Sequence, residues 1–192
     1  LKGLDDFSRV GEYYMLAVEP AEQGYNASYI YCDEETMYIA RDQMKLLEGR
    51  LPQKEDEVVV SRYFLSNYGA DAGIGEKVML SSESFHGEYT VTGILEGYKE
   101  KEVNGTSILL SKEALKGWSG YDPADYRAYV HFKNEQQMDE TELTARSREI
   151  AKKYQLEMPV MNLSYMKFYK QPVNVSMLAL VAGIAVLVII GG

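Results

Sequence analysis

The sequence is poor in cysteine and histidine, which excludes several kinds of site. Among the 192 residues there is one cysteine, Cys32, so neither an intramolecular disulfide nor a cluster of thiolate ligands can form. The redox compartment stays undetermined. The two histidines, His86 and His131, lie far apart in the chain, outside the H-x-x-x-H and H-E-x-x-H spacings of zinc sites. We therefore predict no metal site.

The sequence also lacks the common catalytic and cofactor motifs. No G-x-S-x-G nucleophile elbow occurs, and Ser84 near His86 has no third group to complete a triad. Residues 73–75 (GIG) are followed by Glu76 rather than by a glycine that opens a helix, so we expect no phosphate-binding loop. Residues 33–35 (DEE) lack the alternating acids of a calcium loop. We predict no catalytic residue and no cofactor.

Basic charge is scarce and unevenly distributed. Twenty Lys and Arg residues face 29 Asp and Glu residues, giving a net charge of -9, which argues against nucleic acid as a partner. Every charged residue lies at or before Lys170. We therefore predict two parts, a folded domain over residues 1–170 and an uncharged segment over residues 171–192. The first part is long enough to bury a hydrophobic core.

One long hydrophobic run lies in the uncharged segment. Residues 175–190 read VSMLALVAGIAVLVII, and a helix over residues 175–192 would be about 27 Å long, close to the thickness of a bilayer core. Pro172 suits the first turn of such a helix. We predict that residues 171–192 begin a transmembrane helix. A buried core helix rarely lacks a polar face, and a cleaved anchor-addition tail would follow a polar spacer.

The residues before this run interleave aromatic and basic side chains, which is typical of the headgroup level of a membrane. The predicted membrane-interface residues are Tyr165, Lys167, Phe168, Tyr169 and Lys170. At the other end, the first 30 residues mix acidic and aromatic residues without an apolar segment, so we expect no signal peptide and a start that has been cut.

Local patterns predict an α+β fold with mixed β-sheet lobes and a few helices. Alternating or β-branched runs predict strands over residues 13–18, 28–32, 36–40, 57–60, 77–80, 88–95, 107–110, 126–132 and 160–163. The strands at 77–80 and 88–95 would form a hairpin. This order does not repeat a regular βαβ unit. Residues of about 51–120 are rich in short strands and are predicted to be an inserted lobe.

Capping residues predict where helices begin. A short helix is expected over residues 40–48, and Ser61 and Ser111 are expected to cap two others. Asp139 and Glu142 form a D-x-x-E capping box before an amphipathic helix with an apolar stripe. The sequence contains 16 tyrosines, most of them at predicted strand positions. We expect the tyrosine-rich residues 25–38 to contribute an exposed partner surface.

Four segments match a known family in order and spacing. They are residues 46–52 (LLEGRLP), 57–61 (EVVVS), 74–78 (IGEKV) and 89–94 (YTVTGI). Together they resemble the extracytoplasmic domain, the MacB-like periplasmic core, of MacB/FtsX-type ABC transporter permeases. Glu76 stands where that family usually has Asp. The residues that carry the motif, and for which the resemblance implies structural rather than catalytic roles, are Gly49, Arg50, Pro52, Glu57, Gly75 and Gly93.

The resemblance implies a specific arrangement in the cell membrane. A membrane helix would precede Leu1, a second would start near Pro172, and two more would follow Gly192. The domain would lie on the extracellular or periplasmic side. A cytoplasmic ABC ATPase, and a second permease subunit, would be its partners. Nucleotide-driven closure would move the helices and, through them, the domain.

Two other function classes stay open at this stage. An α+β domain between two membrane helices is also typical of ligand-sensing receptors, which would show a signalling domain further along the chain. A membrane-anchored enzyme is the third class, although no set of catalytic residues supports it. The substrate or protein partner of the domain is not predicted by the sequence.

Overall fold

The computed structural model describes residues 2–22, 24–41, 44–68, 72–96, 105–122 and 125–156. The chain divides into two compact units, Leu1–Lys133 and Asn134–Gly192. Within the described ranges, no helix is long and apolar enough to cross a bilayer. The expected transmembrane helix, the interface residues before it and the strand at 160–163 lie outside these ranges, so they stay predictions. The inserted lobe at about 51–120 also stays a prediction.

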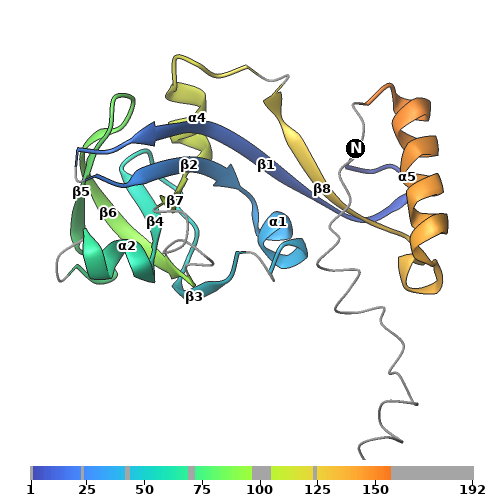
Figure 1. Ribbon diagram of the computed structural model, residues 1–192, viewed down its shortest axis with the longest axis horizontal. Coiled ribbons are helices and arrows are strands. Elements are labelled where there is room, and N and C mark those ends of the chain that lie inside the picture. Colours follow the sequence, from blue (N-terminus) through green and yellow to red (C-terminus); the bar gives the residue numbers. More distant parts are fainter. Residues whose placement is uncertain are drawn as a thin grey trace, which may run out of the picture. The chain divides into compact units, whose positions relative to one another are not determined.

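The first unit is built around one mixed sheet, drawn in Figure 1. In its described part the sheet has eight strands, of which seven follow the order β3-β6-β4-β7-β2-β1-β8 and the eighth, β5, pairs with β6. Two pairs, β2 with β7 and β4 with β6, are parallel, and the other pairs are antiparallel. The strands are β1 (Phe7–Pro20), β2 (Asn26–Cys32), β3 (Leu46–Gly49), β4 (Glu57–Ser61), β5 (Lys77–Ser81), β6 (His86–Leu95), β7 (Gly105–Leu110) and β8 (Arg127–Phe132).

In the described part of the first unit, three short helices accompany the sheet, and each begins at a capping side chain. They are α1 (Glu34–Ile39), α2 (Arg62–Asn67) and α4 (Lys112–Gly117). The Ser61 hydroxyl accepts a hydrogen bond from the Phe64 amide, and the Ser111 hydroxyl accepts one from the Ala114 amide. Both serines had been expected as caps, and both predictions are confirmed.

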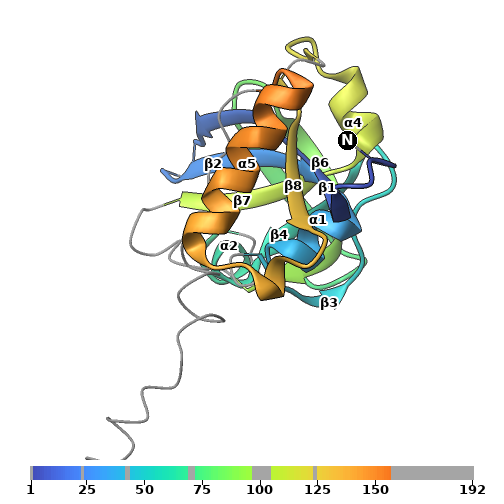
Figure 2. The same cartoon turned by 90° about the vertical axis from the view of Figure 1, so that its right-hand side faces the viewer.

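The second unit contains η2 (Glu135–Gln137) and the longer helix α5 (Glu140–Tyr154), the orange helix of Figure 2. The predicted capping box is confirmed, because the Asp139 carboxylate accepts from the Glu142 amide while the Glu142 carboxylate accepts from the Asp139 amide. Leu143, Ile150 and Ala151 are buried and form one stripe along α5. This stripe is the apolar face that the sequence predicts.

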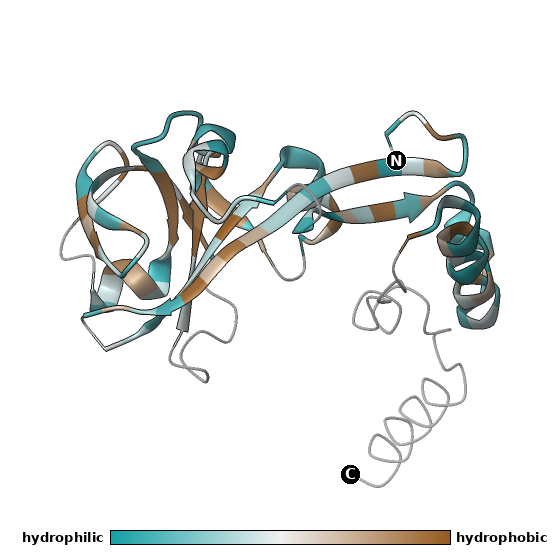
Figure 3. Ribbon diagram, turned by 90° about the horizontal axis from the view of Figure 1, so that it is seen from above, coloured by the Kyte–Doolittle hydropathy of each residue, from teal (hydrophilic) through white to brown (hydrophobic). Residues whose placement is uncertain are grey.

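The sheet buries apolar side chains on both faces, which explains the unbroken apolar run of β4. Successive residues of a strand point to opposite faces. Val58 and Val60 join the larger core cluster with Tyr14 and Phe64, whereas Val59 joins a smaller cluster with Cys32. Figure 3 shows by contrast that hydrophobic and hydrophilic residues are mixed along the long strand β1. All five residues of β4 are buried.

The predicted β5–β6 hairpin is confirmed, and its tip is fastened to the region where β1 ends and β2 begins. The Ser84 hydroxyl and amide both donate to the Glu19 carboxylate. The Ser82 hydroxyl donates to the Tyr29 hydroxyl at 2.7 Å. The Glu22 amide donates to the Ser81 carbonyl at 3.1 Å. These bonds close the sheet around the larger core cluster.

Residues 36–40 are not the strand that their aromatic and β-branched composition predicts. They belong mostly to α1, because Asp33 caps the helix by accepting a 2.9 Å hydrogen bond from the Thr36 amide. The helix also lies against β1, where the Thr36 hydroxyl donates to the Glu12 carbonyl at 2.8 Å. A Cβ on Gly11 would come within 2.4 Å of Thr36, so this approach requires glycine. Contact with a distant strand therefore overrides local propensity.

The helix expected over residues 40–48 is also wrong where the structure describes it. Leu46–Gly49 is strand β3, in which Leu46 pairs with Leu95 and Gly49 pairs with Gly93 on β6. The apolar residues Met44, Leu46 and Leu47, followed by Gly49 as a stop, suggested the helix. The edge of β6, distant in the sequence, instead offers backbone partners that a strand can use.

The tyrosines of residues 25–38 are mainly core residues, which corrects the expected partner surface. Tyr25 and Tyr29 are 1% and 0% exposed, and Tyr31 is 8% exposed. Their rings contact other rings, with Tyr29 lying 4.2 Å from Phe85 between ring centroids. Of this group, Tyr38 is an exposed side chain, at 46%. Substituting Tyr29 or Tyr31 would therefore test the core rather than a partner.

Two buried tyrosine hydroxyls should respond oppositely to removal. The Tyr25 hydroxyl has no hydrogen-bond partner among the residues that the structure describes, whereas the Tyr29 hydroxyl accepts from Ser82. We expect Tyr25→Phe to leave the free energy of unfolding unchanged or raise it by up to about 1 kcal/mol, and Tyr29→Phe to lower it by about 1 kcal/mol. Urea unfolding followed by fluorescence of Trp118, the single tryptophan, measures both. Equal losses would contradict the assignment.

Candidate functional site

The residues of the sequence motif meet at a corner formed by β3, the loop before β4, and β6. Arg50 follows β3, and Glu57 is the first residue of β4. The guanidinium forms two hydrogen bonds to the carboxylate, Nη1 to Oε2 and Nη2 to Oε1, both 2.8 Å long. The Arg50 side chain is half-exposed at 48%, whereas the Glu57 side chain is 7% exposed. The buried charge is thus paired to a cation at the surface.

The loop that joins the two residues also binds the carboxylate. The amides of Gln53 and Lys54 donate to Glu57 Oε2 at 2.8 and 3.2 Å, directly after Pro52. The hydrogen bonds from Arg50 are the main cause that lowers the pKa of Glu57 to about 2, and these amides add to it although burial opposes them. Glu57 therefore stays ionised and acts as a structural anchor of the loop.

Gly49 and Gly93 allow two backbones to approach closely at the same corner. Gly49 has a φ of +79°, and a Cβ there would lie 2.1 Å from the Thr92 carbonyl oxygen. A Cβ on Gly93 would lie 2.8 Å from the Arg50 carbonyl oxygen. The Arg50 amide donates to the Thr92 carbonyl at 2.9 Å. Both glycines are therefore required by tertiary contact, and not by a turn alone.

Gly75 has a different role, because it lies in the turn before β5. Its φ is +88°, and a Cβ there would meet nothing within 4 Å. The Gly75 amide donates to the Val91 carbonyl, and the Val91 amide donates to the Glu76 carbonyl, both at 2.8 Å. The Glu76 carboxylate accepts from the Gly73 amide at 2.7 Å, so the residue that departs from the family pattern still closes this turn.

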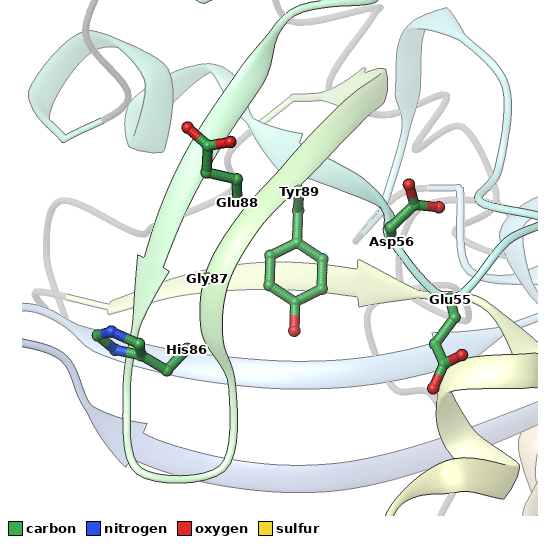
Figure 4. Close-up of a pocket in the computed structure, with 6 residues that line it drawn as sticks. All are labelled: Glu55, Asp56, His86, Gly87, Glu88 and Tyr89. Carbon is green, nitrogen blue, oxygen red and sulfur yellow. The ribbon is translucent and has the colours of Figure 1, made fainter.

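A shallow hollow beside the β5–β6 hairpin is lined by six residues, which Figure 4 labels. They are Glu55, Asp56, His86, Gly87, Glu88 and Tyr89. The Tyr89 ring stands between Glu88 on one side and Glu55 and Asp56 on the other. Burial, and then the charge of Glu55, raises the pKa of Tyr89. Glu88 is paired with Lys77 at 3.0 Å. Nothing here forms a pair of nucleophile and base.

The other sequence candidates have structural roles. Ser84 bonds to Glu19 rather than to His86. Asp33 caps α1, and Glu35 forms an ion pair with Arg9 at 2.8 Å. Among the described residues, no group of three or more His, Cys, Asp or Glu side chains has a geometry that could hold a metal ion.

Two features of the structure were not anticipated from the sequence. Lys2, Glu12, Asp33 and Lys112 form a network of ion pairs where β1, α1 and α4 meet. An aromatic cluster surrounds the buried Tyr14, whose ring contacts those of Trp118, Tyr121 and Tyr126. Both join residues that lie far apart in the chain. No local pattern in the sequence indicates such contacts.

A comparison with solved structures agrees with this architecture. Neither a scan against family models nor a search of curated proteins finds a match. Among solved structures, the extracellular domain of the noncanonic ABC-type transporter YknZ from Gram-positive bacteria matches with a TM-score of 0.54, 17% identity and 84% coverage of both chains. The chain has the fold of an ABC-transporter extracellular domain.

A second solved structure is a domain assigned to a permease protein of Porphyromonas gingivalis. It has a TM-score of 0.48 and 16% identity, and the match covers 88% of this chain and 86% of that one. The likeness to the YknZ domain lies in the arrangement of the elements, since 17% of the aligned residues are identical. The predicted α+β class and the predicted resemblance in fold are confirmed. The roles of the motif residues stay a proposal.

The stabilising contribution of Glu57 should be lost at acidic pH. Its pKa is lowered from 4.5 to about 2 by folding, so the unfolded chain binds the proton more readily. The stability that Glu57 contributes is therefore complete above about pH 4.5 and is lost as the pH falls towards 2. We expect Glu57→Gln to lower the free energy of unfolding at pH 7 by roughly 2 kcal/mol and to flatten its dependence on pH in this window.

Urea unfolding at a series of pH values measures this effect. Glu96→Gln is the matched control, because Glu96 pairs with Lys45 at 3.8 Å and both side chains are more than half exposed. This control should change the free energy of unfolding by less than about 0.5 kcal/mol. A Glu57→Gln protein with the pH profile of the wild type would contradict the role assigned to the ion pair.

The two kinds of glycine at the motif should differ in their tolerance of alanine. Gly49→Ala places a methyl group against the Thr92 carbonyl and also strains a positive φ, whereas Gly75→Ala meets only the strain. We expect Gly75→Ala to cost about 1–2 kcal/mol and Gly49→Ala to cost more than about 3 kcal/mol. Thermal unfolding of the two variants side by side measures the difference. Equal losses of stability in the two variants would show that the backbone around Gly49 adapts to the added methyl group.

Proposed function

We propose that residues 1–170 form a non-catalytic extracytoplasmic domain of an ABC transporter permease. The domain binds a substrate or protein partner outside the cell membrane and couples it mechanically to ATP-driven movement of the membrane helices. A cytoplasmic ABC ATPase supplies the energy, and a second permease subunit completes the transporter. The observation that carries the proposal is the likeness in fold to the extracellular domain of YknZ, over 84% of both chains.

The geometry of the motif corner supports a mechanical role. The charge of Glu57 is neutralised by Arg50 and by two loop amides, so the strongest polar interaction at the corner serves the fold. Gly49 and Gly93 bring the backbones of β3 and β6 into direct contact. A corner held in this way transmits movement as a rigid body. It offers no reactive group to a substrate.

The hydrophobic run of residues 175–190 supports a membrane location. A domain that carries such a run next to its last charged residues suits a permease more than a free binding protein. The alternative of a ligand-sensing receptor domain shares this location. In a receptor, the chain beyond residue 192 would carry a signalling domain instead of two further membrane helices.

The side of the membrane can be tested with a single engineered thiol. Glu83 is exposed at the β5–β6 hairpin, whereas the natural Cys32 is 4% exposed, and burial raises the pKa of its thiol to about 12. The test uses full-length protein that keeps Cys32 and has no cysteine elsewhere. In this protein we expect Glu83→Cys to react with a membrane-impermeant maleimide on intact cells or, in a Gram-negative source, on intact spheroplasts. The unmodified Cys32 protein is the control and should not react.

Labelling of Glu83→Cys only after the membrane is permeabilised would place the domain in the cytoplasm and overturn the proposal. Association with an ATPase is tested in the same cells by isolating the full-length protein in mild detergent and identifying the proteins bound to it. We expect an ABC ATPase to be retained with it. A signalling domain in the same chain, with no ATPase retained, would favour the receptor alternative.

A further inference from the structure

Strand β1 belongs to two different pairings along its length. Residues 13–20 pair with β2, and residues 7–13 pair with β8. The first half of β1 therefore leaves the main sheet as a ribbon with β8, which Figure 1 shows as a long continuation of the blue strand. At about 3.3 Å per residue, the 14 residues of β1 extend about 46 Å. Strand β1 contacts β2, β8 and α1, so its movement would reach all three elements.

The segment before β1 folds back along this strand. The Lys2 ammonium lies 3.0 Å from a carboxylate oxygen of Glu12, ten residues further on, and 3.1 Å from a carboxylate oxygen of Asp33. Lys112, the first residue of α4, binds the other Glu12 oxygen at 2.9 Å. We call these four residues, Lys2, Glu12, Asp33 and Lys112, the charge junction. It connects the entering segment to β1, to the cap of α1 and to α4.

The Asp33 carboxylate of the charge junction is held by backbone amides, whereas the Glu12 carboxylate is held by the two lysines. The Glu12 amide donates to the Asp33 carboxylate at 2.9 Å, and the Asp33 amide donates to the Glu12 carbonyl at 3.1 Å. Hydrogen bonds from Lys112 and then Lys2 hold the pKa of Glu12 below its usual range, against the effect of burial. Glu12 and Asp33 are thus fixed and ionised, and Lys2 is the member that belongs to the entering segment.

The entering segment buries little surface of its own. Lys2, Gly3 and Asp5 are exposed, and nothing lies within 4 Å of where a Gly3 Cβ would be. Its backbone turns into β1 through a 3.3 Å hydrogen bond from the Phe7 amide to the Leu4 carbonyl, and the Lys133 amide donates to the Asp6 carbonyl at 3.1 Å. A force applied to the chain before residue 2 therefore acts first on the ion pairs of Lys2 and only then, through residues 3–6, on strand β1.

We infer that the charge junction is the point where movement of the membrane helix before Leu1 enters the domain, with Lys2 as the coupling residue. The inference rests on the proposed function, which places that helix before the domain. Lys2 transfers the movement at once to β1, α1 and α4, rather than through a flexible segment that would absorb it. Lys133 is the contrasting case, because its partner Asp5 is fully exposed and their separation is 3.5 Å.

The test uses the full-length permease with its ATPase in lipid nanodiscs. A donor dye at Glu83→Cys and an acceptor dye on lipid headgroups report the distance from the hairpin tip to the membrane. We expect ATP to change the energy transfer in the wild type and Lys2→Met to reduce that change by about half or more, as for a residue on a coupling route. Lys2→Arg should retain the change, and so should the matched control Lys133→Met.

Thermal unfolding followed by Trp118 fluorescence separates coupling from folding, since Lys2→Met and Lys133→Met should unfold with the wild type. A Lys2→Met protein with the full wild-type response to ATP would overturn the inference and leave the proposed function intact. A loss shared equally by Lys133→Met would also overturn it, because general weakening of surface charge would then explain the result. A wild type that does not respond to ATP would overturn the proposed function and this inference together.

Discussion

Strand β4 is buried along its whole length, and this burial constrains the rest of the fold. The strand lies between β6 and β7, with apolar side chains packed on both faces. It begins with the carboxylate of Glu57, which would be very costly to bury without a partner. Arg50 and the loop amides satisfy that charge. The loop before β4, the end of β3 and the close contact with β6 all follow from this requirement.

The same requirement explains why the motif reads as it does. An arginine directly after Gly49 reaches Glu57 because the glycine lets β3 turn tightly against β6. Pro52 then leads into the amides that complete the carboxylate's hydrogen bonds. Gly49, Arg50 and Pro52 thus serve one interaction, the neutralisation of the buried Glu57 charge, whereas Gly75 belongs to a separate turn before β5. Such a motif marks a fold and does not by itself name a substrate.

Rigidity and attachment are divided between different parts of the first unit. The corner at Arg50 and Glu57 and the hairpin contact between Ser84 and Glu19 close the sheet around its core. The ribbon of β1 and β8 leaves that closed part, and the charge junction fastens the entering chain to it. Under the proposed function, in which the domain follows moving membrane helices, both properties are needed. A rigid sheet without a firm attachment to the entering chain would not follow the membrane helices, and a loose attachment would absorb their movement.

The sequence by itself determined the features that depend on neighbouring residues. These are the strands with alternating patterns, the serine caps at Ser61 and Ser111, the capping box of α5 and the family motif, since each is set within a few residues. Only the tertiary structure decided that residues 34–39 form a helix on Gly11, that Leu46 pairs with Leu95, and that Tyr25, Tyr29 and Tyr31 are buried. It also decided which carboxylate each lysine meets, because ion pairs such as Lys112 with Glu12 join residues whose proximity exists only after the sheet has formed.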